Sequence, residues 1–251
     1  MKEDSMFKEF KVFNKVKENE VVTSFYLTPK DGSKLKTHKA GQFLSIKPII
    51  QGENSTEVRQ YSLSMKPGEE FYRISVKREE KGLISRYLHD NVNVGDMVEI
   101  TEPLGEFILK DSSKPLVLIS GGIGITPMMS MLYKAMEQGR NTTFIQAVIN
   151  TNFHTFKNDI SDMAKKNENL NVEIFYSNPL ETDKLGEDYQ GSGYLTKDWI
   201  EKNLSMDAEF YFCGPLGFMK MIYDALREIG VEESEINYEM FGPSANLATI
   251  K

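Results

Sequence analysis

The sequence predicts two domains, an antiparallel β domain followed by an α/β domain with a parallel sheet. The chain has 251 residues, of which 40% are hydrophobic, enough for two modest cores. From Phe7 to Leu109, short runs alternate apolar and polar residues between turns, which is typical of an antiparallel barrel or sandwich. Beyond a polar turn-forming segment, apolar runs alternate with helical segments, which indicates a parallel sheet with crossover helices. We place the domains at 1–112 and 113–251.

Six strands and one helix are expected in the first domain. Each strand candidate alternates apolar and polar residues and is followed by turn-forming residues. The candidates are residues 7–18, 21–29, 42–49, 59–64, 71–78 and 96–109. The helix candidate is "GLISRYLHDNV", which begins near Gly82.

The second domain is expected to contain buried strands, each followed by a helical segment. The strand candidates are residues 116–120, 144–150, 172–177 and 209–214. After the first of them we expect a helix with Thr126 as its N-cap and Pro127 at its first position. The last strand leads into the apolar-periodic helix "LGFMKMIYDALREIG". Lys165 and Lys166 fit the solvated face of another helix.

Charge and hydropathy exclude several classes of function. Against 37 Asp and Glu there are only 30 Lys and Arg, and the net charge of -7 repels a nucleic-acid backbone. No apolar run approaches the ~20 residues needed to cross a bilayer. The N-terminal residues also lack the apolar core of a secretion signal. We therefore expect a cytoplasmic protein with no membrane span and no nucleic-acid partner.

Cysteine and histidine usage argues against a metal site. Cys213 is the single cysteine, so the chain can form neither an internal disulfide nor an iron–sulfur cluster with four thiolates. His38, His89 and His154 are scattered along the sequence, and we interpret them as surface or structural residues.

A glycine-rich turn follows the first strand of the second domain. Gly121, Gly122 and Gly124 lie between that strand and a helix, in "LISGGIGITPM". Glycines allow a close backbone approach, and the N–H groups at a helix start favour an anion such as a pyrophosphate. The turn differs from the G-x-G-x-x-G fingerprint, and glycines of this kind also serve tight packing.

A second turn of the same kind strengthens the interpretation of a dinucleotide site. Cys213, Gly214 and Pro215 end the last strand candidate and lead into a helix. Ligands bind beyond the carboxyl ends of parallel strands, so two such ends can address one molecule. An isolated cysteine is more often a small buried hydrophobe, although its place at this edge favours a role in the site. The methionines of "MMSML" fit the core face of a helix.

In the first domain, the strand "RQYSLS" carries unusual polar groups. Arg59 and Tyr61 share one strand face, and Ser62 points to the other. One interpretation is an edge strand with a surface Arg–Glu pair. A flavin interpretation uses every group, because arginine can pair with a phosphate, tyrosine can cover an aromatic ring and serine can bond its edge. The helix start from Gly82 to Ser85 could supply the remaining phosphate donors.

Taken in order, these motifs resemble the ferredoxin-NADP reductase superfamily over essentially the whole chain. The most similar members are the reductase portions of flavohaemoglobins. The resemblance rests on "AGQFLSI", "RQYSLS", "ISVKREEKGLISRYLHD", "VGDMVEITEPLGEF", "LISGGIGITPM", "FCGPLGFM" and "INYEMFGP". It implies a six-stranded antiparallel FAD-binding barrel followed by a nicotinamide-binding α/β domain, whose C-terminal tail returns to the flavin.

The resemblance also implies which residues bind each cofactor and act at the hydride-transfer point. FAD would contact residues on two strands and the helix start: Arg59, Gln60, Tyr61, Ser62, Lys77, Arg78, Glu79, Gly82, Leu83, Ile84 and Ser85. The nicotinamide cofactor would contact residues at the two turns: Gly122, Gly124, Thr126, Gly214 and Pro215. The catalytic residues would be Ser62, Cys213, Glu239 and Phe241, with Phe241 covering the flavin face that nicotinamide must reach.

Three features depart from the family pattern. The barrel begins at about Phe7, so we expect no preceding globin and no haem acceptor within the chain. The cysteine count leaves no ferredoxin segment. Ile125 stands where flavohaemoglobins often have a polar residue, so that edge of the nicotinamide site is expected to differ.

The resemblance implies a flavin-dependent NADH oxidoreductase that passes electrons from FAD to a separate redox protein. That partner could be a haem protein, an iron–sulfur protein or an oxygenase component. Two alternatives remain open, namely a reductase of small acceptors such as free flavin, quinone or ferric chelate, and a non-catalytic nucleotide-binding sensor subunit. NADPH is less favoured, because Asn178 follows the strand after which NADPH enzymes place an arginine, although Lys184 could still reach the 2′-phosphate.

Overall fold

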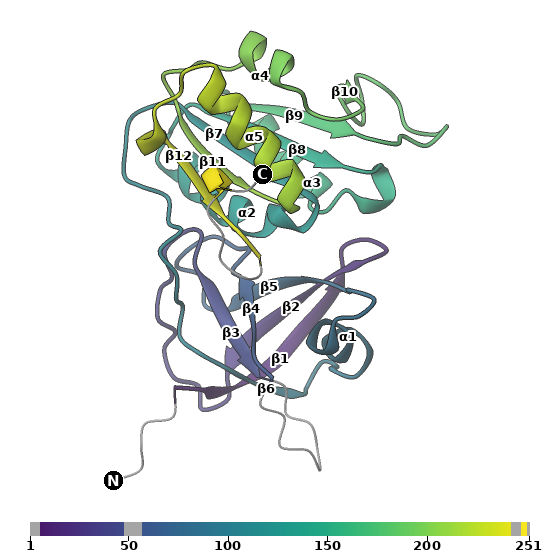
Figure 1. Cartoon of the computed structure of the whole chain (residues 1–251). Helices are drawn as coiled ribbons and strands as arrows, with labels where there is room; N and C mark the ends of the chain where they lie inside the picture. Colours follow the sequence, from purple (N-terminus) through teal and green to yellow (C-terminus); the bar gives the residue numbers. More distant parts are fainter. Residues whose placement is uncertain (1–5, 48–56, 242–246, 250–251) are drawn as a thin grey trace.

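The computed structural model describes residues 6–47, 57–241 and 247–249, which form two domains stacked end to end (Figure 1). The first domain holds six strands and one helix, and the second holds a parallel sheet covered on both faces. The C-terminal strand of the second domain points down toward the barrel (Figure 1).

The N-terminal domain is an antiparallel sheet of six strands in the order β4-β3-β6-β1-β2-β5. The edge strands β4 and β5 meet through a bridge between Leu63 and Ile74 and a bond from Ser64 N to Arg73 O, so the sheet closes into a barrel. The strands are β1 (Lys8–Lys17), β2 (Val22–Pro29), β3 (Phe43–Lys47), β4 (Arg59–Ser62), β5 (Tyr72–Lys77) and β6 (Met97–Ile100). The predicted residues 48–49 of the third strand lie outside the described part of the chain.

The helix α1 (Leu83–Asp90) packs against the barrel through one apolar face. Ile84 and Leu88 are fully buried in the barrel core, whereas Leu83 is exposed. Spacing of three to four residues places both buried side chains on one side of the helix. The opposite side and the first turn remain available to solvent or ligand.

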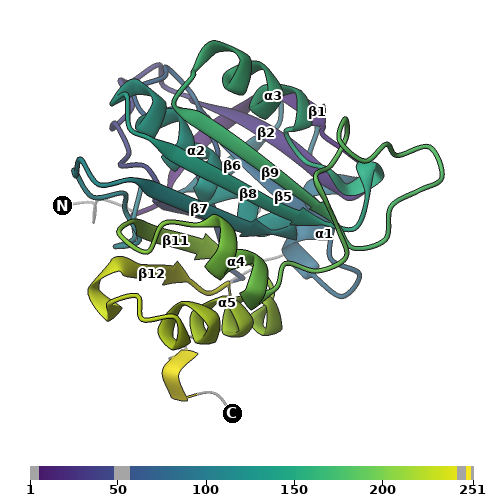
Figure 2. The same ribbon diagram turned by 90° about the horizontal axis from the view of Figure 1, so that it is seen from above.

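The C-terminal domain is a parallel sheet in the order β10-β9-β8-β7-β11-β12. Helices α2 (Ile125–Glu137) and α3 (Lys157–Lys166) cover one face, and α4 (Lys197–Asn203) and α5 (Leu216–Glu228) cover the other (Figure 2). The strands are β7 (Leu116–Gly121), β8 (Thr142–Val148), β9 (Leu170–Tyr176), β10 (Gly191–Ser192), β11 (Glu209–Cys213) and β12 (Ile236–Glu239). Four short 3-10 turns are η1 (Gly122–Gly124), η2 (Thr151–Phe153), η3 (Glu233–Glu235) and η4 (Leu247–Thr249).

Apolar burial follows the predicted pattern on both faces of this sheet. Met128, Met129 and Met131 of α2 are fully buried against the sheet, which confirms their interpretation as core residues. Lys165 and Lys166 are exposed in the last turn of α3, also as predicted. The sequence did not reveal β10, which has only two residues, nor β12, although β4 and β6 are equally short and were predicted.

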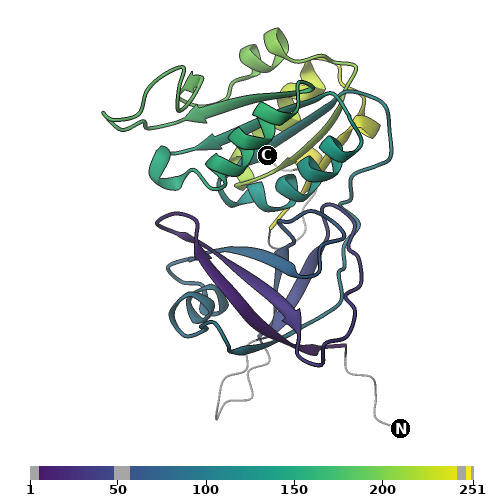
Figure 3. The same cartoon turned by 180° about the vertical axis from the view of Figure 1, so that it is seen from behind.

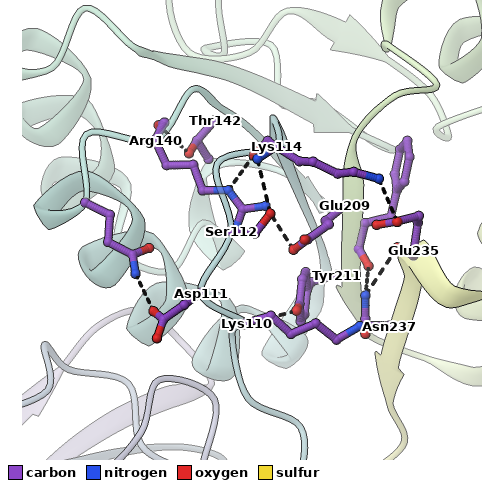
Figure 4. Close-up of polar contacts among 12 residues, drawn as sticks. Lys110, Asp111, Ser112, Lys114, Arg140, Thr142, Glu209, Tyr211, Glu235 and Asn237 are labelled. Atoms are coloured by element: carbon purple, nitrogen blue, oxygen red, sulfur yellow. Dashed lines mark hydrogen bonds and ion pairs between the residues drawn. The ribbon is translucent and has the colours of Figure 1, made fainter.

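The segment that connects the two domains switches its hydrogen bonds from the first domain to the second between Leu109 and Lys110. Leu109 N donates to Ala40 O of the barrel, and Lys110 N donates to the Tyr211 hydroxyl of the second domain at 3.1 Å. Residues 110–114 are then held to the amino ends of the parallel strands by the polar contacts in Figure 4. The hydrogen bonds thus change domain slightly before the predicted boundary.

The prediction that Thr126 caps the helix after the glycine turn is wrong. The 3-10 turn η1 runs directly into α2, whose N-cap is Gly124, and no side chain caps it. The Thr126 hydroxyl instead donates to Ile123 O at 3.2 Å. Because the turn is already helical, the first free N–H groups belong to the glycines of the turn. Since α2 begins at Ile125, Pro127 is its third residue rather than its first.

Neither a membrane-spanning helix nor a metal cluster is present in the described parts of the chain. No helix there is long and apolar enough to span a membrane. The described His, Cys, Asp and Glu residues form no group that could hold a metal ion. His38 and His154 are buried and bonded to Ser130 and Tyr176, respectively.

Candidate cofactor site

The first cavity lies between the barrel and the C-terminal domain and has a volume of about 740 Å³. Its barrel wall comes from β4, from the end of β5 and from the start of α1. Its upper wall comes from the glycine turn and from the residues after β12. Among the predicted site residues, the cavity is lined by Arg59, Gln60, Tyr61, Ser62, Lys77, Glu79, Gly82, Leu83, Ile84, Ser85, Thr126, Glu239 and Phe241.

All four residues of strand β4 line this cavity, including Ser62, which the alternation places on the opposite face from Arg59 and Tyr61. Arg59 is exposed and forms an ion pair with Glu57 at 2.9 Å, so the surface Arg–Glu pair exists alongside the cavity. Tyr61 is half-buried, and burial raises the pKa of its phenol above the ordinary value. Ser62 is buried, and its hydroxyl has no hydrogen-bond partner. A buried hydroxyl without a partner is unusual and is suited to accept or donate to a bound group.

The start of α1 offers backbone donors to the same cavity. Gly82 is its N-cap, no side chain bonds the free N–H groups, and the first turn has no acidic residue. A Cβ at Gly82 would lie 2.4 Å from the Ser85 hydroxyl oxygen, so a larger residue here would displace that hydroxyl. The Ser85 hydroxyl donates to Gly82 O and accepts from Glu79 N, which fixes this turn. Such a helix start favours an anionic group.

A second cavity of about 810 Å³ adjoins the first and belongs mainly to the C-terminal domain. It lies at the carboxyl ends of β7, β8, β9 and β11, where ligands bind in open parallel sheets. Gly122, Gly214 and Pro215 line it as predicted, together with Gly121. Gly122 has φ +53°, a conformation that glycine adopts without strain.

Four residues line both cavities, and they mark the boundary where two ligands could meet. They are Lys77, Glu79, Ile123 and Phe241. Phe241 is 48% exposed, an unusual fraction for a large aromatic side chain between two domains. An aromatic ring in this position can be displaced without loss of core packing.

Cys213 and Glu239 lie side by side beneath this boundary. They end the paired strands β11 and β12 and are partners in the register. Cys213 is fully buried and lines neither cavity, and burial together with the Glu239 carboxylate raises the pKa of its thiol. Glu239 lines the first cavity, one of its carboxyl oxygens has no partner, and burial raises its pKa to about 7.

Gly124 packs closely against the end of β11 and lines neither cavity. It is buried, and a Cβ there would lie 2.1 Å from Cys213 O. The turn after β7 therefore packs directly on the end of β11, which brings the two predicted turns together. Ile125, the first residue of α2, is fully buried in the core and lines neither cavity.

One predicted site residue, Arg78, is engaged elsewhere, as are the two residues considered for the choice between NADH and NADPH. Arg78 forms a two-pronged ion pair with Asp90, with N–O distances of 3.0 and 2.8 Å, and does not line either cavity. The Lys184 ammonium group pairs with Glu187 at 3.2 Å. Asn178 donates its backbone N–H to Ile149 O and also lines neither cavity.

Sequence reasoning missed much of the apolar wall of the second cavity. The wall combines side chains from the barrel hairpin and from four segments of the α/β domain, including Val21, Val22, Val148, Ile149, Phe153, Phe175, Tyr194, Leu195, Leu216 and Phe218. For the residues of the α/β domain, their place at or just beyond the carboxyl ends of parallel strands could have pointed to this wall, but no such signal marks Val21 and Val22 of the barrel hairpin. The first cavity is also lined by Ser75 and Met240, which lie within quoted motifs but were given no role.

The residues present fit a flavin in the first cavity and a nicotinamide dinucleotide in the second. Ser62 and Glu239 offer unpartnered polar atoms for a polar ring edge, and Tyr61 offers an aromatic face. Arg59, Lys77 and the start of α1 are suited to phosphates. The glycine turns leave room for backbone contact with a pyrophosphate.

This fold and site define a two-domain oxidoreductase with one domain for FAD and one for NAD. Residues 9–108 match the oxidoreductase FAD-binding domain family, and residues 118–224 match the oxidoreductase NAD-binding domain family. The two matched regions coincide with the barrel and the α/β domain.

Solved structures define the family more closely. The flavohem-like FAD/NAD-binding domain of nitric oxide dioxygenase from Vibrio cholerae is 35% identical, with a TM-score of 0.85 over 94% of this chain and 99% of that one. Flavohemoglobin from Malassezia yamatoensis, with bound FAD and heme, is 25% identical, with a TM-score of 0.81 over 94% of this chain and 60% of that one. The chain therefore belongs to the ferredoxin-NADP reductase-like family of FAD- and NAD-binding oxidoreductases.

Curated relatives show the same similarity at higher identity. A flavohemoprotein from Bacillus thuringiensis subsp. konkukian is 45% identical over 250 residues, covering 96% of this chain. The chain spans 62% of that relative's length. The resemblance to the reductase portion of flavohaemoglobins and the predicted fold class are thus confirmed.

Proposed function

We propose that the protein is a flavin-dependent NADH oxidoreductase that passes electrons from NADH through FAD to a separate acceptor. The observation that carries this proposal is the pair of adjoining cavities with Phe241 on their shared boundary. Ser62 and Glu239, each with an unpartnered buried atom, line the first cavity beside it. FAD accepts hydride from nicotinamide and can release the electrons one at a time.

In this proposal the barrel holds FAD through three kinds of contact. Arg59 exchanges its exposed pairing with Glu57 for a charge-assisted bond to a phosphate. Tyr61 covers one face of the ring, and Ser62 bonds its edge. The remaining contacts come from Gln60, from residues 77–79 and from residues 82–85, with Arg78 contributing only its backbone because its guanidinium pairs with Asp90.

The C-terminal domain holds the nicotinamide cofactor at the two turns. Gly122, Gly214 and Pro215 line the second cavity at the carboxyl edge of the sheet, where their backbone would contact the dinucleotide. Thr126 lines the first cavity, at its border with the second domain. Phe241 covers the face that nicotinamide must reach and moves away when the cofactor enters.

The groups beneath the boundary keep the reacting rings dry and oriented. Burial keeps the Cys213 thiol protonated, so it presents a neutral, polarisable surface rather than an anion. Burial raises the pKa of Glu239 to about 7, which favours the protonated carboxyl over the carboxylate compared with an exposed glutamate. The Ser62 hydroxyl has no partner in the protein, so it can either donate a hydrogen bond to the flavin edge or accept one from it.

We propose a preference for NADH over NADPH. Ser177 lines the second cavity at the end of β9, and the next residue is Asn178 rather than an arginine. The nearby Lys184 is already paired with Glu187. A 2′-phosphate at this end would therefore lack a preformed cationic partner.

The acceptor in this proposal is a haem, iron–sulfur or oxygenase protein. A structurally similar protein, phthalate dioxygenase reductase, is described as transferring electrons from pyridine nucleotides to [2Fe-2S], at 26% identity and a TM-score of 0.74. Small acceptors such as free flavin, quinone or ferric chelate remain the second candidate. The half-exposed Phe241 at the edge of the first cavity favours this second candidate.

An anaerobic absorbance titration tests the proposal. Purified protein saturated with FAD is titrated with NADH and, in a second sample, with NADPH. We expect the flavin to bleach near one equivalent of NADH and to need a large excess of NADPH. Bound nucleotide without bleaching would instead support the sensor interpretation, and equal response to both nucleotides would remove the NADH preference.

The role of Arg59 predicts a loss of flavin affinity in Arg59→Ala. One charge-assisted bond to a phosphate contributes about 1.5–3 kcal/mol, so FAD should dissociate about 10- to 100-fold more readily. Fluorescence recovery on FAD release gives the dissociation constant. Arg86→Ala is the matched control, because Arg86 is exposed on α1 and lines neither cavity. Equal affinity in the two variants would contradict the assignment.

A further inference from the structure

Arg73 is a buried positive charge at the contact between the two domains. It lies on β5 and is 7% exposed. Its Nε donates to the Ser64 hydroxyl at 3.2 Å, and Nη2 donates to Ser64 O. The barrel therefore fixes one edge of the guanidinium group.

A row of buried serine hydroxyls connects this anchor to the first cavity. Ser64 Oγ lies 2.8 Å from Ser75 Oγ, which lies 2.7 Å from Ser24 Oγ. All three serines are buried, and Ser75 lines the first cavity. A fully bonded buried network is rigid, so the position of Arg73 is tied to the wall of the flavin cavity.

The other side of the guanidinium contacts the C-terminal domain. Its central carbon lies 4.6 Å from the centre of the Phe156 ring, within the range of a cation–π interaction. Nη1 lies 3.9 Å from the Asp159 carboxylate on α3. Phe156 is buried and has φ +60°, which is strained for a residue with a side chain. Strain of this kind persists only where neighbouring contacts hold it.

Phe156 directly follows residues that form the wall of the second cavity. Phe153 and Thr155 line that cavity. The Thr155 hydroxyl also accepts a bond from Asn19 Nδ2 at 2.8 Å, at the tip of the β1–β2 hairpin. Figure 3 shows this hairpin reaching from the barrel toward the C-terminal domain. Contacts from the barrel therefore hold the start of α3 and the adjoining cavity wall.

We propose that Arg73 is a positioning residue that sets the wall of the nicotinamide cavity against the flavin cavity. It is anchored by the serine row on the barrel and holds Phe156 on the C-terminal domain. This inference rests on the proposed function, because it assigns Arg73 to the approach of the two cofactors. Arg73 lines neither cavity.

Three variants separate this role from general stability. Arg73→Met removes the charge but keeps much of the side-chain volume. Phe156→Leu removes the aromatic partner from the other domain without touching the serine row. Lys66→Met is the matched control, since it removes an exposed interdomain ion pair with Glu137 at 3.5 Å.

The first measurement is equilibrium and kinetic. Isothermal titration gives NAD⁺ affinity, and stopped-flow bleaching at saturating NADH gives the limiting rate of flavin reduction. For Arg73→Met and Phe156→Leu we expect the limiting rate to fall about tenfold and NAD⁺ affinity to fall several-fold, because small misplacements slow transfer steeply. FAD affinity should stay within about twofold of the parent protein, and Lys66→Met should match the parent. Lower FAD affinity with an unchanged limiting rate would overturn the proposal.

A double-mutant cycle on unfolding provides the second measurement and needs no cofactor. If Arg73 and Phe156 act together, the midpoint shift of the double variant should be smaller than the sum of the single shifts. Additive shifts would overturn the proposed contact even if the protein never reduces flavin. If Arg73→Met does not fold, Arg73→Lys replaces it in the cycle, and that variant should recover part of the coupling.

Discussion

At the scale of single residues, the site is marked by polar atoms that the protein itself leaves unbonded. Ser62 Oγ and Glu239 Oε2 are two of the five buried side-chain atoms that lack a partner in the described residues. Both line the first cavity, at the positions that the motifs predicted. The sequence could identify these residues because their type and order form motifs. It could not predict that Cys213 lies behind the cavity wall, since this depends on how β11 packs.

Glu239 predicts a specific pH dependence of stability. Burial raises its pKa from 4.5 to about 7 in the folded state, so folding favours the protonated form. Its contribution is fully present below pH 4.5 and is lost as the pH rises through 7. At 1.36 kcal/mol per pKa unit the loss is at most about 3 kcal/mol. We expect Glu239→Gln to abolish this loss, because glutamine does not ionise.

Fluorescence of Trp199 provides the measurement. It is the only tryptophan and packs on Phe175 within the C-terminal domain. Urea unfolding of the flavin-free protein gives the free energy of unfolding at each pH. Between pH 5 and 8 this free energy should fall more for the parent than for Glu239→Gln. Parallel curves for the two proteins would show that Glu239 ionises without a penalty and is more hydrated than its burial suggests.

At the scale of elements, local patterns predicted most strands but not the detail of the turns. Alternation identified β1, β2, β3 and β5 and also the four-residue strands β4 and β6, whereas β12, of the same length, was not identified. The glycine turn after β7 was found, but its helix start was misplaced. An N-cap signal assumes an extended residue before the helix, and here a 3-10 turn replaces it.

The glycine turn predicts a sharp difference between two substitutions. In Gly124→Ala the new Cβ would lie 2.1 Å from Cys213 O, so β11 and the turn must separate. Overpacking of backbone costs about 1–3 kcal/mol or more. Gly217→Ala in α5 meets no atom within 4 Å and should stabilise its helix by up to about 1 kcal/mol.

Trp199 fluorescence during urea unfolding also measures this pair, since both glycines belong to the C-terminal domain. Gly124→Ala should also bind NAD⁺ more weakly, because the turn and the end of β11 line or support the second cavity. If both alanine variants unfold at the parent's midpoint, the close approach of the turn to Cys213 is not present in solution.

At the scale of the whole molecule, the arrangement of the two domains depends on contacts that no sequence pattern reveals. Arg73, Asn19 and Lys66 each contact a residue far away in the chain. They carry no motif, because an interdomain contact has no fixed spacing. Motif order predicted that two cofactors would meet between the domains, and only the structure brings Ser62, Glu239 and Phe241 to one cavity.

The linker between the domains is held by a buried ion pair. Arg140 Nη2 lies 2.9 Å from Glu209 Oε2, with side-chain exposures of 2% and 6%, and Arg140 Nε donates to Lys114 O at 2.6 Å (Figure 4). The pair thus joins the linker to the amino ends of β8 and β11. A buried pair is costly to break, because the remaining charge has no solvent to compensate it.

Glu209→Gln should therefore destabilise the C-terminal domain by about 3 kcal/mol and loosen the linker as well. Urea unfolding followed by Trp199 gives the first effect. Trypsin cleavage after Lys110 under native conditions gives the second, since Lys110 lies in the linker, whereas the bond between Lys114 and Pro115 resists trypsin. Glu187→Gln is the control, as it removes an exposed ion pair with Lys184 and should cost less than about 1 kcal/mol. Faster cleavage without lower stability would show that the pair orders the linker without stabilising the domain, whereas no change in either would contradict the role given to the pair.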